Sequence, residues 1–306
     1  MRWVLPLPLL LGPLAWLPAA EPDASVPAEA VPVTPAKPKG QSGEAPQPDI
    51  EYLYLPSASA TNADGHESQG ELRVKVGAPP WWRSGSGEFG SVLGAGYGRI
   101  DVDQEGLDLP STLQSAYLNS VSFWNFSESG SASLILTPGI RTADTSIEWA
   151  DTRLFVGAFT NWRLDSRWTL GVGAVSTSNH LKTVTIPIAS IVWRPTDDVT
   201  VWFQGIAAQV QWKVVPAWTV GGSYSLISSL DYQLPANDPD GEIIIQRDIR
   251  VLGNARWNAT RMLSIGGVLG GAFRRSFRWD GDGPTRDNLE LSPALIVGGT
   301  LFLRFF

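Results

Sequence analysis

Ser176, Ser178, Asn179 and His180 lie together in one short stretch, and they are residue types that a nucleophilic hydrolase would use. A serine attacks a carbonyl when a histidine takes its proton and a third group orients that histidine. The sequence has no Gly-x-Ser-x-Gly elbow, Walker loop or metal-spaced His and Cys cluster. The stretch therefore predicts a solvated loop, and a lipid-modifying enzyme is the least favoured of three hypotheses.

Two loops concentrate acidic residues with glycine, from Asn237 to Glu242 and from Asp280 to Gly283. Such loops can hold calcium, but neither has the spaced ligands and the final bidentate glutamate of a twelve-residue calcium loop. Ordinary polar turn chemistry explains both loops better. We expect no metal and no cofactor.

Charged residues recur at every second position of several segments with strand character, and alternate residues of a strand face the same side. This alternation predicts a set that faces an enclosed lumen. The set is Arg99, Asp101, Asp151, Arg153, Asp248, Arg250, Arg256, Arg274, Arg278 and Arg304. It holds seven arginines against three aspartates, so an open lumen would favour anions. The alternative is that these charges pair across strands and plug the lumen.

The last two strand-like segments show what lies on the opposite side. Their apolar set, which is expected to face lipid, is Leu263, Ile265, Leu269, Phe273, Leu301, Leu303 and Phe305. In residues 263 to 279 the same alternation also assigns Arg275, Phe277 and Trp279 to the apolar face. One oily face and one polar face are typical of a strand between lipid and a wet lumen.

No stretch after residue 20 contains the roughly 18 to 20 apolar residues that a membrane-spanning helix needs. A closed barrel is the other structure that satisfies all backbone polar groups within lipid. The sequence therefore predicts an all-β protein, an antiparallel transmembrane β-barrel. Alternation of short and long turns gives fourteen strands with both ends in the periplasm, and twelve if residues 50 to 77 are peripheral.

Residues 1–20 predict a cleaved export signal, with Arg2 before an apolar core and Ala19 and Ala20 at its end. Residues 21–49 are rich in proline and alanine and poor in large apolar residues, so we expect a disordered periplasmic tether. The barrel is expected over residues 50–306. The absence of cysteine excludes disulfides and a lipidated cysteine after the signal.

Most tryptophans after the signal fall within a residue or two of an expected strand end, which predicts aromatic girdles at the membrane interfaces. The positions are 81, 82, 124, 149, 162, 168, 193, 202, 212, 218, 257 and 279. Core tryptophans of a soluble sandwich would instead lie in the middle of strands.

Several strand and turn patterns resemble an uncharacterised family of bacterial outer-membrane barrels that is known only as a domain of unknown function. The patterns are Leu109-Pro110, Leu136-Thr137-Pro138-Gly139, Leu170-Gly171-Val172-Gly173, Val192-Trp193-Arg194-Pro195, Asp248 and the glycine-rich penultimate strand, over roughly residues 90–306. The resemblance implies the barrel fold and carries no catalytic or binding residues. The ending at Phe306 also resembles the carboxyl-terminal signal that the barrel-assembly machinery reads, although Arg304 shares the face of Phe306.

Three hypotheses for function follow. The first is a passive outer-membrane barrel, either a narrow pore or a structural protein, which is monomeric and contacts outer-membrane lipid and the assembly machinery. The second is a surface interaction scaffold that acts through loops 56–70, 233–242 and 280–289, and the third is the enzyme with His180. The formal charge of −7 gives no indication of nucleic-acid binding.

Overall fold

The computed structural model describes residues 48–77, 82–83, 89–143, 148–205, 207–235, 243–280 and 288–303. Nearly all of them lie in strands. The strands are β1 (Asp49–Ser59), β2 (His66–Gly77), β3 (Trp82–Arg83), β4 (Phe89–Glu105), β5 (Thr112–Asn125), β6 (Gly130–Thr142), β7 (Thr152–Arg163), β8 (Trp168–Ser178), β9 (Thr183–Thr196), β10 (Val199–Gln204), β11 (Ala207–Val215), β12 (Trp218–Gln233), β13 (Ile243–Asn258), β14 (Leu263–Asp280), β15 (Leu289–Leu291) and β16 (Ala294–Leu303), with one 3₁₀ turn, η1 (Trp149–Asp151). The expected signal and most of the expected tether lie outside these residues.

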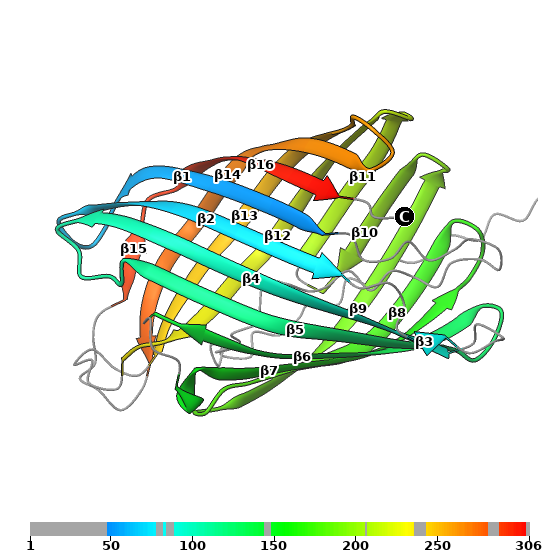
Figure 1. Cartoon of the computed structure of the whole chain (residues 1–306), viewed down its shortest axis with the longest axis horizontal. Coiled ribbons are helices and arrows are strands. Elements are labelled where there is room, and N and C mark those ends of the chain that lie inside the picture. Colours follow the sequence, from blue (N-terminus) through cyan, green and yellow to red (C-terminus); the bar gives the residue numbers. More distant parts are fainter. Residues whose placement is uncertain are drawn as a thin grey trace, which may run out of the picture.

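Fourteen of these strands form one closed antiparallel barrel (Figure 1). Sequential strands pair in order from β4 to β14, β2 pairs with both β1 and β4, and β16 joins β14 to β1. The short β3 and β15 add to β4 and β14. The prediction of an all-β barrel with fourteen strands is therefore confirmed. In the described part of the chain, no helix is long and apolar enough to cross a membrane.

The turns alternate as expected. Residues 126–129, 164–167, 197–198, 216–217 and 259–262 make short turns at one end, where β1 begins and β16 ends. Short turns mark the periplasmic end of such barrels. The prediction of an outer loop over residues 56–70 is wrong, because β1 and β2 continue as a ladder to the pair Ser59 and His66. Only residues 60–65 connect these two strands.

The two strands on either side of β13, β12 and β14, carry β-bulges at the same height. The register shifts between Ser225 and Ser228 in β12, and between Arg247 and Ile249 in β13 opposite Arg274 in β14. Arg274 has φ +49°, which lies in the left-handed region that is costly for a residue with a side chain. Each bulge bends its strand and changes which residues face inward. Because β13 is paired with both bulged strands, the outer ends of β12, β13 and β14 bend together.

The bent strand ends are called here the inward flap, made of residues 230–235, 243–247 and 275–280. Five wall strands separate β12 from β6, yet Gln233 pairs in parallel with Thr142 of β6 and its carbonyl accepts from the amide of Ala143 at 2.7 Å. Lys182, between β8 and β9, also bonds to Asp280 of β14 at 2.7 Å. The inward flap therefore crosses the barrel near its outer end.

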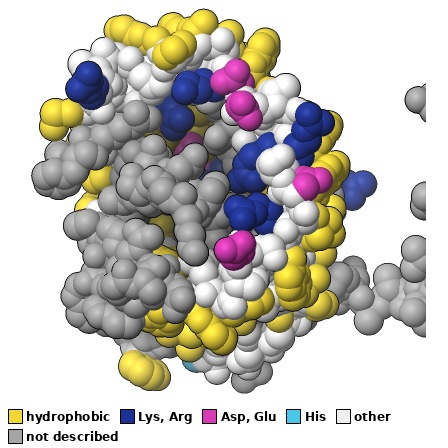
Figure 2. Space-filling model, turned by 90° about the vertical axis from the view of Figure 1, so that its right-hand side faces the viewer, with side chains coloured by type: hydrophobic (Ala, Val, Ile, Leu, Met, Phe, Trp, Pro, Cys, Tyr) yellow, Lys and Arg dark blue, Asp and Glu magenta, His cyan; other side chains and the backbone are white. Residues whose placement is uncertain are grey.

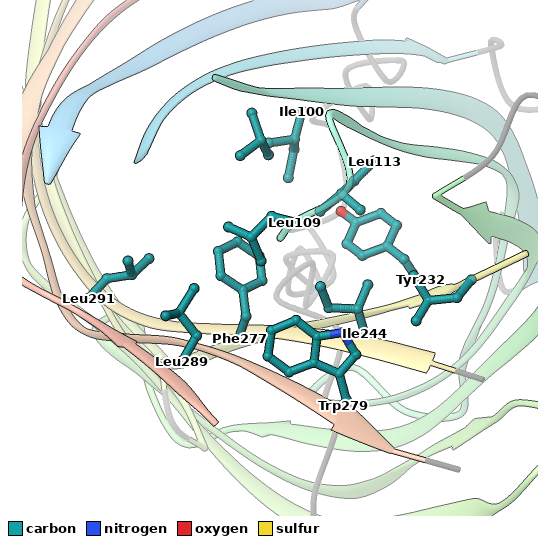
Figure 3. Close-up of a cluster of buried hydrophobic side chains, with 11 residues drawn as sticks. Ile100, Leu109, Leu113, Tyr232, Ile244, Phe277, Trp279, Leu289 and Leu291 are labelled. Carbon is teal, nitrogen blue, oxygen red and sulfur yellow. The ribbon is translucent and has the colours of Figure 1, made fainter. Parts of the chain in front are cut away.

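An apolar cluster fills the space between the inward flap and the opposite wall (Figure 3). Tyr232, Ile244, Phe277 and Trp279 project from the inward flap. Their partners come from β4, β5, β15 and the loop after β4: Ile100, Val102, Leu109, Leu113, Leu289 and Leu291. The expectation that Arg275, Phe277 and Trp279 face lipid is wrong, because the bulge at Arg274 turns them inward.

The bulge supplies a direct test. Arg274→Gly should fold as well as the wild type, because glycine adopts a positive φ without steric cost. Deletion of Arg274 should sharply lower the folded fraction, because it would turn Arg275, Phe277 and Trp279 toward lipid. The measurement is the fraction that resists SDS until boiled. Equal folding of the deletion variant and the wild type would show that the bulge does not set the inward face.

Candidate functional site

The wall of the barrel is one strand layer thick, so a side chain that the barrel shields from solvent must lie on its inner side. By this criterion Arg153, Asp248 and Arg250 lie inside, with at most 9% of each residue exposed. Asp151 is buried in η1, where its carboxylate accepts from the amide of Glu148 at 2.6 Å. Arg256 is half-buried on the same side of β13 as Arg250, with its guanidinium 5.1 Å from the ring centroid of Phe302.

Four other charged residues expected in the lumen lie elsewhere. Arg99 and Asp101 are exposed and pair with each other at 2.8 Å, because Ile100 and Val102 take the inner positions of β4 in the apolar cluster. Arg274 is exposed at the bulge, and Arg278 follows the outer phase beyond it, opposite to the buried Phe277 and Trp279. Arg304 lies outside the described residues.

One buried network connects β2 to β13 across the inner side of β1, β16 and β14. Arg250 donates to both carboxylate oxygens of Glu71, at 2.7 and 2.5 Å, and also bonds to Asp248 at 2.6 Å. Arg73 adds a bond to Glu71 at 3.1 Å. A bidentate guanidinium and carboxylate pair fixes geometry as well as charge. This pairing links two parts of the wall that share no strand ladder.

A second pair lies beside the first network. Arg275 of β14 donates to Glu67 of β2, and both side chains are almost completely buried. Between the two ion-paired sets, Gln246 of β13 donates to Gln69 of β2 at 3.1 Å. Buried ions in proteins are paired, because an isolated one is very costly to remove from water. The polar residues of β2 therefore form a row that holds β13 and β14 at the bulges.

A third network anchors the inward flap to the opposite wall. Asp231 accepts from Arg153 at 2.7 Å, from Arg141 at 3.2 Å and from the side chain of Asn179 at 3.0 Å. Arg153 also donates to the carbonyls of Ala150 and Thr152. These donors belong to β6, β7 and the turn after β8. The carboxylate of Asp231 therefore links β12 to β6, β7 and the turn after β8 on the far side of the lumen.

The expected excess of arginine is not found among the buried residues. The buried charged residues in the described part of the chain are Glu67, Glu71, Asp151, Asp231 and Asp248 against Arg153, Arg250 and Arg275. The half-buried Arg73 and Arg141 pair with two of these acids. Glu67, Glu71, Asp231 and Arg275 were not among the expected residues. The alternation of Glu67, Gln69, Glu71 and Arg73 was the available signal, but the expected strand began only at residue 71.

In the space-filling view most charged side chains lie on the inner side of the ring, and hydrophobic ones surround its outside (Figure 2). Of the residues expected to face lipid, Ile265, Leu269 and Phe273 are exposed on the outer side, and Leu263, Leu301 and Leu303 are half-buried. Phe305 lies outside the described residues. Exposed apolar side chains on an unpartnered outer wall form the surface that lipid would cover.

Seven tryptophans form a ring on the outer side at the periplasmic end, where the indole N–H can stay wet. They are Trp124, Trp162, Trp168, Trp193, Trp212, Trp218 and Trp257. Neighbours in this ring stack, with centroids 5.5 Å apart for Trp168 and Trp193. Trp279 does not belong to a girdle, because it is buried in the apolar cluster.

The serines near His180 have other partners. Ser178 Oγ lies 2.8 Å from Thr183 Oγ1, and Ser176 Oγ accepts from Thr185 Oγ1 at 3.0 Å. His180 is exposed. Within the described ranges, no group of three or more His, Cys, Asp or Glu side chains could hold a metal ion. The acidic loop of residues 237–242 and residues 281–283 lie outside those ranges.

No protein-family model and no curated protein matches the sequence. Solved structures that match include the NanC porin, at 8% identity and a TM-score of 0.39, covering 84% of this chain and 100% of that one. The KdgM porin in complex with disordered oligogalacturonate matches at 7% and 0.37, covering 83% and 98%. A Rhodopseudomonas blastica porin matches at 10% and 0.31, covering 84% and 99%. At these values the likeness assigns no function.

The chain's own features define its class. The barrel closes on itself, its outer wall presents apolar side chains, and tryptophans form a ring at one end. A soluble protein would cover such an apolar wall, whereas lipid covers it in a membrane. The protein is a β-barrel of the bacterial outer membrane.

The buried pairs predict a specific pattern of stabilities. Arg275→Met should destabilise the barrel by about 3–5 kcal/mol, because it leaves Glu67 buried without its cation. The double variant with Glu67→Gln should lose clearly less, because no charge remains unpaired. Arg99→Met, at an exposed pair, is the control and should change stability little. Urea-induced unfolding in lipid vesicles measures all three, and equal losses in the single and double variants would contradict the buried pairing.

Proposed function

We propose that this barrel is a passive, narrow channel of the outer membrane. The observation that carries the proposal is a polar inner wall inside a closed apolar shell. Toward the periplasmic end, Gln211 and Lys213 of β11 face inward and are exposed, opposite in phase to the outward Val210 and Trp212. Water in an open lumen would solvate these exposed polar side chains.

The narrowest part of the proposed channel lies near the row of bulges. There the Glu71 and Arg250 pair, the Glu67 and Arg275 pair and the apolar cluster reach inward from several strands. Since three buried and two half-buried arginines balance the five buried acids, the fixed field in this part is weak and ion selectivity is small. We therefore propose weak ion selectivity in place of the anion preference that the sequence predicted. A structural barrel plugged by these pairs is the second reading.

The other expectations remain proposals. The serines beside His180 bond to threonines, which offers no support for a lipid-modifying enzyme. Surface binding through the outer loops, a monomeric state and recognition by the assembly machinery are compatible with the barrel. The resemblance to an uncharacterised family of outer-membrane barrels is a proposal on the same footing.

Ion selectivity tests the channel and the inward phase together. Arg256→Glu should shift the permeability ratio toward potassium, because residue 256 lies on the inner side of β13 and a reversed charge there attracts cations. Arg278→Glu is the matched control on β14 and should leave the ratio unchanged, because Arg278 follows the outer phase. The measurement is the reversal potential of single channels in a planar bilayer under a potassium chloride gradient.

The opposite result has a clear meaning. If Arg278→Glu alters selectivity and Arg256→Glu does not, the inner face of β13 and β14 is the reverse of that described. If wild-type protein folds, resists SDS until boiled and never conducts, the channel is excluded and the plugged structural barrel stands.

A further inference from the structure

The barrel wall is interrupted beside the inward flap. β10 and β11 have only 6 and 9 residues, whereas their neighbours β9 and β12 have 14 and 16. The ladder between β9 and β10 ends at Ser190 and Gln204, and the ladder between β11 and β12 ends at Ser225 and Ala207. In the described residues, Thr183–Ala189 of β9 therefore has no strand partner on that side. This segment is called here the wall notch.

The departure of β12 explains why none of the described strands closes the wall notch. Beyond the bulge at Ser225 and Ser228, β12 keeps its ladder with β13 and reaches β6 at Thr142. It therefore turns into the barrel where it would otherwise complete the wall above the short hairpin. Seven residues that have no ladder partner in the described part of the chain, at about 3.4 Å each, form an edge of about 24 Å along the strand.

The chemistry of this edge suits a lipid environment. The carbonyl of Ala189 accepts from the amide of Gly205 at 2.9 Å, so Ala189 points toward β10. Alternate residues share that direction, which directs the backbone groups of Pro187, Thr185 and Thr183 to the wall notch. Pro187 has no N–H, and proline within sheets is confined to free edges and bulges. The sequence thus removes one of the donors that an open edge would leave unsatisfied in lipid.

The height of the wall notch places it within the membrane. Ala189 lies four residues above the girdle residue Trp193, which is about 10 Å along the membrane normal for a tilted strand. The apolar band of such a barrel is about 25 Å tall. The wall notch therefore begins near the middle of the band and opens into the outer leaflet.

The inner wall next to the wall notch is apolar. Ile186 and Ile188 are half-buried on the inner side of β9 and pack against a buried cluster. The cluster comprises Ile135, Phe155, Phe159 and Val175. Strand pairing places Ile186, Val175, Gly157 and Ile135 in one row from β9 to β6. An apolar surface thus extends from the wall notch around the inside of four strands.

A buried cation stands at the outer end of this surface. Arg153 lies above Phe155 and Phe159 on β7, and its Nη2 atom is buried without a hydrogen-bond partner in the described structure. A cavity beside this guanidinium is lined by Arg153, Arg141, Asp231 and Thr177, and it reaches the apolar cluster at Phe155. At the lower end, the buried Oε1 of Gln204 also lacks a partner among the described residues. Polar groups therefore stand at both ends of an apolar surface.

We propose that the wall notch is a lateral opening through which a single-chain anionic amphiphile, of the fatty-acid class, passes between the lumen and the outer leaflet. The carboxylate binds at Arg153, and the acyl chain lies along Phe155, Phe159 and Ile186. This orientation, with the charged head toward the cell exterior and the chain toward the membrane centre, matches that of the outer leaflet. Entry from the leaflet requires no reversal of the molecule.

Photolabelling of the wild-type protein tests the proposal without any substitution. Protein in lipid vesicles is irradiated with palmitate that carries a diazirine on its chain, and the modified residues are assigned by mass spectrometry. We expect adducts on inward residues such as Phe159 and Ile186, reduced at least tenfold by excess unlabelled palmitate and not by palmityl alcohol. Adducts confined to outward residues such as Leu154, or equal competition by both compounds, would overturn the proposal.

Cysteine labelling tests the opening itself, because the natural chain has no cysteine. A maleimide attached to an acyl chain stays in the membrane and should modify Ile186→Cys within about tenfold of the rate for the outward Leu134→Cys. Ile135→Cys lies in the same inner row, where the wall is paired on both sides, and should react at least 100-fold more slowly. Equally slow labelling of Ile186→Cys and Ile135→Cys would show that the wall is closed at the wall notch and would overturn the proposal. Heat-dependent gel mobility confirms folding of each variant, and neither assay depends on ion conductance.

Discussion

The structure depends on one constraint, which is that every backbone N–H and C=O within lipid must find a partner in the protein. Closure of the barrel through β16, which joins β14 to β1, meets that constraint around most of the wall. The wall departs from a regular ladder at the bulges of β12 and β14 and at the short hairpin of β10 and β11, and other contacts compensate for each departure. Buried ion pairs hold the bulged strands, and the edge of β9 that no described strand covers carries Pro187.

The ion pairs and the bulges support each other. The bulge at Arg274 turns Arg275, Phe277 and Trp279 inward. The row Glu67, Gln69 and Glu71 on β2 contacts β13 and β14 beside this bulge. The inward flap then meets β6 and β7 through Asp231. Apolar packing alone would hold the inward flap but would not fix which residues it meets. Bidentate and multiply bonded charges add that directionality.

Much of the fold could be predicted from the sequence because strand alternation and turn spacing are local signals. The expected segment 199–204 matches β10 residue for residue, and the strand number follows from the alternation of turns. The inner face was predicted less well, since alternation fails at a bulge. Nothing local to Arg274 signals a positive φ, so the expected phase was wrong from there to Trp279. Arg99 and Asp101 were misplaced for a different reason, because the inner position went to the apolar Ile100.

The central claim is that paired charges and the inward flap narrow a channel that is otherwise continuous. Single-channel conductance of the wild type and of the double variant Glu71→Ala with Arg250→Ala tests it most directly. We expect a small wild-type conductance that rises in the double variant, because the pair that bridges β2 and β13 is removed. SDS resistance before boiling confirms the fold of each protein. An unchanged conductance in a folded double variant would contradict the account.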